Sequence, residues 1–281
     1  MKRIFLNIFV AVMALGLASC DNNGKVIVQD DTAKIEAFEN LFSEIEALNS
    51  SFQFDSDLDF QDGFLRRGSF WNRLGFIASA DFTGALIGSP GGGAGALSIG
   101  IVFSLVAMMN DPYVVVDDWM NLDWSVVEMI EFADSDVGAL HNKFIGKILS
   151  EHSTLLDGSK SEAEIISIVS AKLNKHDIDS SVETMSSIMD SRANTLIQKI
   201  LTSNDLVSSM DAAILLYPEL KNELQIARVY LSGVERIHTK ETMVRYTRDV
   251  LEVVRVSDIP DSSREIISSA LTVYANSFVL W

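Results

Sequence analysis

The sequence predicts a mainly α-helical protein: a helical bundle with a glycine-rich helical hairpin and at most one or two short extended segments. Three observations lead to this fold class. The 281 residues include only four prolines, which leaves long stretches free to form helices. Nearly half of the residues (48%) are apolar, enough to build a sizeable core. Along most of the chain, apolar side chains recur at three- and four-residue steps, the period of an amphipathic helix.

The N-terminal residues 1–19 have the composition of a signal peptide. Lys2 and Arg3 precede an uncharged apolar run over residues 4–17. The tetrapeptide LASC at residues 17–20 resembles the lipobox of bacterial lipoproteins. This resemblance implies cleavage just before Cys20 and lipidation of Cys20, which is the only cysteine of the chain. An ordinary signal peptide or an N-terminal anchor helix is the alternative.

The remaining chain is strongly acidic. Without residues 1–19, 20 basic side chains stand against 39 acidic ones, a net charge of −19. Such a surface repels nucleic acids and anionic headgroups, because binding to either depends on cationic side chains. We therefore expect no nucleic-acid partner. The expected membrane contact is the lipid on Cys20, since acyl chains on one cysteine attach a protein stably.

The composition and the spacing of apolar residues predict the first elements after Cys20. Residues 20–31 are polar apart from one β-prone triplet, and we expect a lipidated tether. The helical domain is expected over residues 32–281, with a first helix capped by Asp31 or Thr32. Residues 52–60 alternate apolar and polar side chains, which predicts an extended segment. Its aspartates do not form a calcium loop, because Phe60 stands where that loop needs glycine.

The next predicted helix, with Ser69 as its cap, leads into residues 82–110, which contain no charged side chain. This run is long enough in count to cross a bilayer. However, Pro90 and the three glycines at 91–93 interrupt it. We therefore predict two arms, one ending near Gly88 and one starting near Ala94, that form a hairpin.

Three glycines of this run follow at four-residue steps, Gly84, Gly88 and Gly92, and share one helix face. This pattern resembles the glycine-zipper lipoproteins of bacterial outer membranes, the class that includes the 17 kDa surface antigens. The resemblance implies that these glycines are helix-packing residues. Three alternatives stay open for the hairpin: burial in the bundle, insertion into a bilayer, and a mobile exposed loop.

A second resemblance rests on two short elements. An Ala-Asp-x-x-Gly-Ala element at residues 80–85 precedes the glycine-rich run, and a Gly-x-x-His-Asn element at residues 138–142 stands at a predicted helix start. Both are similar to elements of uncharacterised lipoproteins of Bacteroidota-type bacteria. This resemblance implies a location in the cell envelope and no particular activity.

The rest of the chain is predicted to be helical. A short strand is expected over residues 113–119 and a helix from Asp123 to about Asp136. Residues 137–281 carry six or seven helical patterns of about 11 to 20 residues, which predict a helix bundle. The signals for helix starts are capping boxes at Ser161 with Glu164 and at Ser262 with Glu265, and a first-turn proline at Pro218. The signal for a helix end is Gly233.

No motif of catalysis or metal binding meets its requirements. The glycine run lacks the Lys and Ser or Thr of a phosphate loop, and Ser98 in ALSIG lies in a predicted helix rather than after a strand. The four histidines form neither HExxH nor a cluster. His141 lies on an apolar helical stripe near Leu140 and Phe144, and we expect it to be a partly buried helix histidine with satisfied hydrogen bonds. Two acid pairs, at 117–118 and at 128 and 131, carry little weight among so many acids. We predict no catalytic residue, no metal site and no cofactor.

The expected function is therefore that of a lipid-anchored lipoprotein in the bacterial envelope, at the outer membrane or cell surface. Its expected role is non-catalytic, either binding a protein partner or supporting a complex. The alternative is a membrane-active protein whose hairpin inserts or self-associates, as in a pore former or a bacteriocin. An envelope hydrolase that uses scattered carboxylates is a minor alternative.

Overall fold

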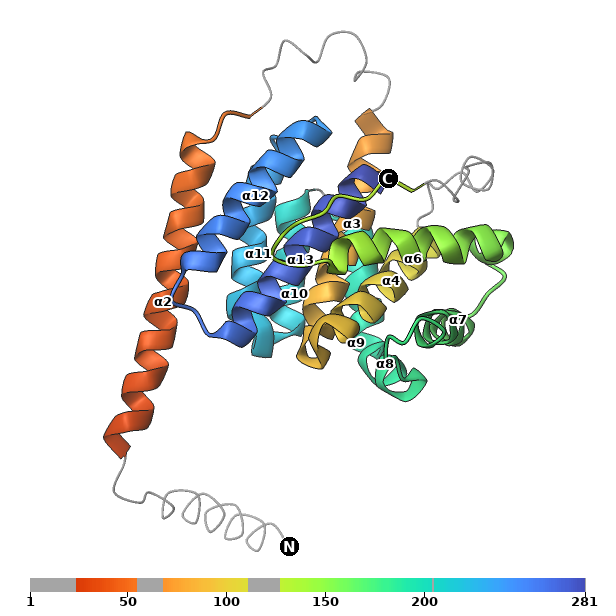
Figure 1. Ribbon diagram of the computed structural model, residues 1–281, viewed down its shortest axis with the longest axis horizontal. Coiled ribbons are helices and arrows are strands. Elements are labelled where there is room, and N and C mark those ends of the chain that lie inside the picture. Colours follow the sequence, from red (N-terminus) through yellow and green to blue (C-terminus); the bar gives the residue numbers. More distant parts are fainter. Residues whose placement is uncertain (1–23, 55–67, 111–126, 204, 281) are drawn as a thin grey trace, which may run out of the picture.

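The structure is a computed structural model that describes residues 24–54, 68–110, 127–203 and 205–280 (Figure 1). The fold class is as predicted: these residues form packed helices, and no strand occurs among them. The expected signal peptide, Cys20 and the strand expected at 113–119 lie outside the described residues. The helices are α2 Gly24–Ser51, α3 Gly68–Gly88, η2 Ser89–Gly91, α4 Gly92–Asn110, α6 Val137–Glu151, η3 Ser153–Asp157, α7 Glu162–Asn174, α8 Val182–Ile188, α9 Ser191–Leu201, α10 Leu206–Leu216, η4 Pro218–Leu220, α11 Lys221–Val234, α12 Lys240–Val256 and α13 Asp261–Leu280.

The glycine-rich hairpin is the centre of the bundle. Helix α3 ends at Gly88, a single 3-10 turn carries Pro90, and α4 begins at Gly92 and returns along α3. The predicted two arms are therefore confirmed. Helices α6, α7, α9 and α13 pack on α4, and α13 and α10 also pack on α3. As a result, every residue of α4 from Ala96 to Met108 is buried.

Helix α2 lies against the outside of the bundle. Its residues Ala37, Phe38, Leu41 and Ile45 are buried, and the helix contacts α11 and α12. Its N-terminal part extends past the other helices (Figure 1), and residues 32–36 are exposed. The helix begins at Gly24, so residues 24–31 of the expected tether are helical instead. Extending an existing helix costs less free energy than starting one. The β-prone triplet at residues 26–28 is too short to stop the extension of α2.

The helix expected from Asp123 is wrong over the residues that can be judged. Residues 127–136, which we call the strap, contain no helix. Side chains from two helices bind the strap's backbone instead. Asn276 accepts a hydrogen bond from Ile130 N (2.8 Å) and donates one to Ile130 O (3.1 Å), and Asn142 donates to Glu128 O (3.0 Å). These bonds satisfy backbone groups that a helix would otherwise satisfy.

After residue 136 the prediction of helices of 11 to 20 residues is confirmed for seven helices, and the short α8 is an addition. Ser161 and Glu164 form the predicted capping box. The second box does not form, because α13 begins at Asp261 and Ser262 lies inside its first turn. Pro218 begins a 3-10 turn that leads into α11.

Helix α11 ends at Val234, one residue after Gly233, so the predicted helix end at Gly233 is confirmed. Gly233 also makes a close contact with α12: a Cβ at position 233 would lie 2.2 Å from the Tyr246 hydroxyl oxygen. The glycine makes room for Tyr246, whose ring stacks on Tyr230 with centroids 5.3 Å apart. Of the extended segment expected at 52–60, only residues 52–54 are described, and the rings of Phe52 and Phe54 both pack against Tyr246.

Candidate functional site

Two of the three predicted packing glycines lie at the contact between the arms of the hairpin. A Cβ on Gly84 would lie 2.7 Å from Phe103 Cβ, and a Cβ on Gly88 would lie 2.3 Å from the carbonyl oxygen of Gly95. Real Cβ atoms do not approach other atoms so closely, so both positions require glycine in this geometry. The partner of this zipper face is therefore the second arm of the same hairpin.

Gly92 does not belong to this contact, and its prediction as a packing residue is wrong. No atom lies within 4 Å of a Cβ built there. Its φ is +69°, in the left-handed region that favours glycine. Gly92 thus serves the turn between the arms, because the 3-10 turn at Pro90 ends the helical face on which Gly84 and Gly88 lie. Gly95 takes the packing position across from Gly88.

A polar pair lies inside the bundle, where the hairpin meets α6. Asp81 of α3 and His141 of α6 are both fully buried, and Asp81 Oδ2 lies 3.9 Å from His141 Nε2. That distance is too long for a hydrogen bond, and His141 Nε2 has no hydrogen-bond partner. On its other side, His141 Nδ1 lies 3.3 Å from Asn142 Oδ1. His141 is therefore a helix histidine as predicted, but it is fully rather than partly buried, and only one of its two ring nitrogens has a hydrogen-bond partner.

Gly100 of α4 makes room for this pair. A Cβ there would lie 3.4 Å from Asp81 O and 3.5 Å from His141 Cδ2, both ordinary contacts. The pair therefore connects three elements, α3, α4 and α6. Asp81 is the only charged residue between Gly75 and Asn110, and it lies at this junction.

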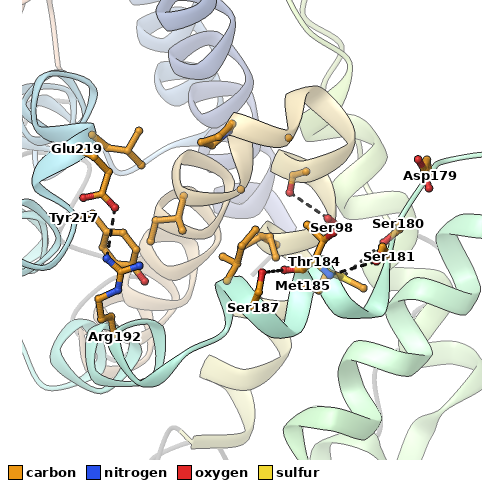
Figure 2. Close-up of a pocket in the computed structure, with 18 residues that line it drawn as sticks. Ser98, Asp179, Ser180, Ser181, Thr184, Met185, Ser187, Arg192, Tyr217 and Glu219 are labelled. Atoms are coloured by element: carbon orange, nitrogen blue, oxygen red, sulfur yellow. Dashed lines mark hydrogen bonds and ion pairs between the residues drawn. The ribbon is translucent and has the colours of Figure 1, made fainter.

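A cavity of about 540 Å³ lies at the tip of the hairpin (Figure 2), and we call it the hairpin-tip cavity. One wall is the hairpin turn, from Ile87 to Ile99. The opposite wall is α8 with the loop that precedes it, and Arg192 of α9 and Tyr217 close one end. This volume falls within the range of small-molecule sites in proteins.

The closed end of the cavity has a defined geometry. Arg192 Cζ lies 4.8 Å from the centroid of the Tyr217 ring. The guanidinium is also held by two carboxylates: its Nε donates to Asp190 Oδ2 (3.0 Å), and its Nη1 lies 3.5 Å from Glu219 Oε1. Tyr217 is only 3% exposed, and burial raises the pKa of its hydroxyl to about 12. The phenol is therefore uncharged and able to donate a hydrogen bond at physiological pH.

The other candidate residues are not brought together. Ser98 donates to Gly95 O (3.2 Å), its own helix backbone, as expected for a helix-interior serine. Glu128 is exposed and pairs with Lys240. His152 and His176 are exposed, and no group of three His, Cys, Asp or Glu side chains in the described ranges could hold a metal ion. The acid pair at 117–118 and Cys20 lie outside these ranges.

Comparison of the chain with protein families, with curated proteins and with solved structures finds no match. What the site can do is therefore argued from its geometry. By length and composition, one helical stretch of the described chain, Gly75–Asn110, is apolar enough to cross a membrane, and 72% of its most apolar window is buried. A core helix of a soluble protein meets the same criteria, so this observation alone does not decide between the two.

The sequence contained a signal for part of this site. Asp81 is a lone charge in a long apolar stretch, which marks a buried position that needs a polar neighbour. Its partner His141 was singled out by its place in an apolar stripe. Tyr217 and Arg192 gave no local signal, because they meet only when the turn after α10 packs beside α9.

Proposed function

We propose that the chain is a lipid-anchored protein of the bacterial envelope with a non-catalytic role in binding or in supporting a complex. The LASC sequence that ends at Cys20 supports the anchor. The observation that carries the proposal further is helix α2, which begins four residues after Cys20. A lipid on Cys20 would thus be followed almost directly by a helix.

Helix α2 is suited to hold the bundle away from a membrane surface. From Gly24 to Glu36 it rises about 20 Å at 1.5 Å per residue, and residues 32–36 are exposed ahead of the buried Ala37 and Phe38. Its exposed part passes beyond the rest of the bundle (Figure 1). A stalk of this kind leaves the bundle surface accessible to a partner.

Fractionation of the exported chain tests the anchor. The full chain is expected in the membrane fraction, labelled by an alkyne analogue of palmitate. As a control, residues 1–20 are replaced by a signal peptide that type I signal peptidase cleaves, so that the exported chain begins at Asp21 without a thiol. This chain is expected in the soluble fraction, without label. A full chain that is soluble and unlabelled would overturn the proposal.

A second candidate function, membrane activity of the hairpin, is favoured by one specific observation. Residues 75–110, the two arms formed by α3 and α4, meet the length and apolarity criteria of a membrane span, and 72% of their most apolar window is buried. Asp81, the one charged residue between Gly75 and Asn110, lies against His141 of the surrounding shell. Separation of the shell from the hairpin would leave an apolar pair of helices to enter a membrane.

Dye release from phosphatidylcholine vesicles tests this second candidate. A disulfide between Gly93→Cys and Val137→Cys would lock α4 to α6, because a Cβ on Gly93 lies 3.5 Å from Val137 Cγ2. A membrane-active chain would release the dye without the lock, and with the lock only after reduction. If the unlocked chain releases no dye, the second candidate fails while the anchor proposal stands.

A further inference from the structure

A group of basic side chains lies where α6 and α7 meet. We call it the lysine face, and its members are Lys143 and Lys147 of α6, and Lys172, Lys175 and His176 at the end of α7. The whole chain carries 22 basic side chains against 39 acidic ones, a net charge of −17. Four lysines gathered on so acidic a protein form a local positive potential that can attract an anion.

Contacts between the two helices hold the lysine face together. The turn after α7 brings His176 against α6, since its backbone N–H donates to Leu173 O (2.8 Å) and the next residue, Asp177, has a φ of +59°. His176 Nε2 lies 3.3 Å from Lys147 Nζ. The His176 ring packs on the Phe144 ring with centroids 5.3 Å apart, and Lys147 Nζ lies 5.7 Å from the Phe144 centroid. The fold thus fixes an ammonium and an imidazole side by side.

The positive charges of the lysine face are only partly compensated. Lys172 is bound to Glu151 of α6. None of the other three lysines forms an ion pair with a described acid, and two of them, Lys143 and Lys175, are exposed. Desolvation, followed by repulsion from all four lysines, lowers the pKa of His176. The imidazole is therefore largely uncharged at neutral pH, and an anion bound here would remove the repulsion.

Helix stability does not account for the whole face. A lysine in the last turn of a helix stabilises its carbonyl end, which describes Lys172. Lys143 lies in the middle of α6 instead, outside the reach of that effect. Like charges three or four residues apart on a helix repel each other, and the face contains two such pairs, Lys143 with Lys147 and Lys172 with Lys175. A bound anion would turn this repulsion into attraction.

The position of the lysine face restricts the kind of anion. Figure 1 shows α6 and α7 on the opposite side of the bundle from α2, so the face lies away from a membrane that the N-terminal end of α2 approaches. A long polyanion such as a nucleic acid would extend onto the acidic remainder of the surface, which repels it. A compact anion avoids both difficulties.

The residue types of the lysine face favour phosphate. None of its five members is an arginine. Arginine matches planar carboxylates with two parallel hydrogen bonds, whereas the lysine ammonium binds phosphate oxygens as a point charge. Several ammonium groups spread over two helices suit a ligand with more than one phosphate group.

We propose that the lysine face binds a compact molecule that carries several phosphate groups. Its phosphate oxygens bind Lys143 and Lys147 from α6, and Lys175 and His176 from the end of α7. The bound anion favours protonation of His176, so that the imidazole becomes a further donor. The ligand thereby ties α6 to α7. This binding is separate from the lipid anchor and does not depend on it.

Tripolyphosphate is a suitable probe, because it is small and contains three phosphate groups. The exported chain that begins at Asp21, which contains every described helix, is titrated with it by calorimetry at physiological salt. We expect saturable binding. The double change Lys143→Gln and Lys147→Gln is expected to weaken binding about tenfold. The double change Lys199→Gln and Lys221→Gln removes the same charge from exposed positions on α9 and α11, and should leave the affinity within about twofold.

NMR spectroscopy of the histidine rings gives a second readout. Tripolyphosphate should raise the pKa of His176, because the bound anion offsets the repulsion from the lysines. The ring signals of His238, which lies between α11 and α12, should not move. An effect limited to His176 would place the ligand at the lysine face.

Two further ligands test the class of anion. A butanetetracarboxylate carries a similar charge on planar groups and is expected to bind about fivefold more weakly or worse. Phosphatidylglycerol vesicles should not retain the chain. The proposal is overturned if tripolyphosphate does not bind, if the two double variants weaken binding equally, or if the pKa of His176 does not rise. Equal binding of the tetracarboxylate, or retention on the vesicles, would also contradict it.

Discussion

Gly88 and Gly95 face each other across the hairpin so closely that a Cβ on either would lie 2.3 Å from the carbonyl oxygen of the other. Both contacts are with backbone, which cannot move aside as a flexible side chain would. The two arms of the hairpin are therefore held at a separation that only glycine permits at these two positions.

Gly88→Ala is expected to lower the free energy of unfolding by about 1–3 kcal/mol through overpacking. Gly100→Ala is the matched control in the same hairpin. A Cβ at Gly100 makes only ordinary contacts, 3.4 Å or longer, so the gain in helix propensity should raise stability by up to about 1 kcal/mol. Urea denaturation of the two variants measures both effects. Equal stability of the two would contradict the close approach at Gly88.

Asn276→Ala is expected to free the strap at residues 127–136. The change removes both hydrogen bonds that Asn276 makes with the Ile130 backbone and leaves buried groups unsatisfied, at a cost of about 2–4 kcal/mol. Hydrogen exchange, read by mass spectrometry, should become faster in the strap. Asn40→Ala, on the exposed side of α2, is the control and should leave this exchange unchanged. Unchanged exchange in Asn276→Ala would show that other contacts hold the strap.

Asp81 and His141 are expected to be energetically coupled. Removing one member of this buried polar pair leaves the other without its neighbour, so the two single changes should cost more together than the double change does. Asp81→Asn and His141→Gln in one double-mutant cycle should give a coupling of about 1–3 kcal/mol. Combining Asp81→Asn with His152→Gln, at an exposed histidine, should be additive. Additivity in both cycles would mean that the 3.9 Å approach has no energetic consequence.

Tyr217→Phe is expected to leave the protein equally stable, or more stable by up to about 1 kcal/mol, because the buried hydroxyl lacks a partner. Tyr246→Phe is the matched comparison. The Tyr246 hydroxyl bonds to Asn49 Oδ1 (2.6 Å) and lies 3.1 Å from Tyr230 O, so its loss should cost about 1–3 kcal/mol. Thermal unfolding separates the two outcomes. A loss of stability in Tyr217→Phe as large as in Tyr246→Phe would assign the Tyr217 hydroxyl a structural role.

The protein is expected to lose stability in alkali. Burial raises the pKa of Tyr217 to about 12 and raises the pKa of Tyr230, Tyr246 and Tyr274 above the ordinary value as well. The unfolded chain releases these protons near pH 10, so between pH 10 and 12 the unfolded state binds fewer protons than the folded state. Stability therefore falls as the pH rises through this window.

Urea midpoints at pH 9 and pH 11.5 measure this effect. The Tyr217→Phe variant should show a smaller decrease between the two pH values than the unchanged chain, because it lacks one of the four phenols. A midpoint that stays constant over this interval would contradict the burial of the tyrosines.

The features that the sequence predicts correctly are those decided by neighbouring residues. Pro90 and the glycines after it divide the hairpin, and the hydroxyl of Ser161 three residues before Glu164 caps α7. The prediction of a helix was wrong for the strap because the strap's conformation depends on hydrogen bonds with Asn276, which is 146 residues from Ile130. The hairpin-tip cavity was missed for the same reason, since Tyr217 and the hairpin turn share no local pattern.

The position of α13 has a consequence for the order in which the chain folds. Synthesis proceeds from the N-terminus, so the apolar hairpin is complete while the helix that covers both of its arms, the 20-residue α13 at the C-terminal end, has still to be made. Helices α6, α7, α9 and α10 are made earlier and can cover other faces of the hairpin, but the face under α13 stays uncovered until the final helix is made. A premature stop codon anywhere before Asp261 would leave that face of the hairpin exposed permanently.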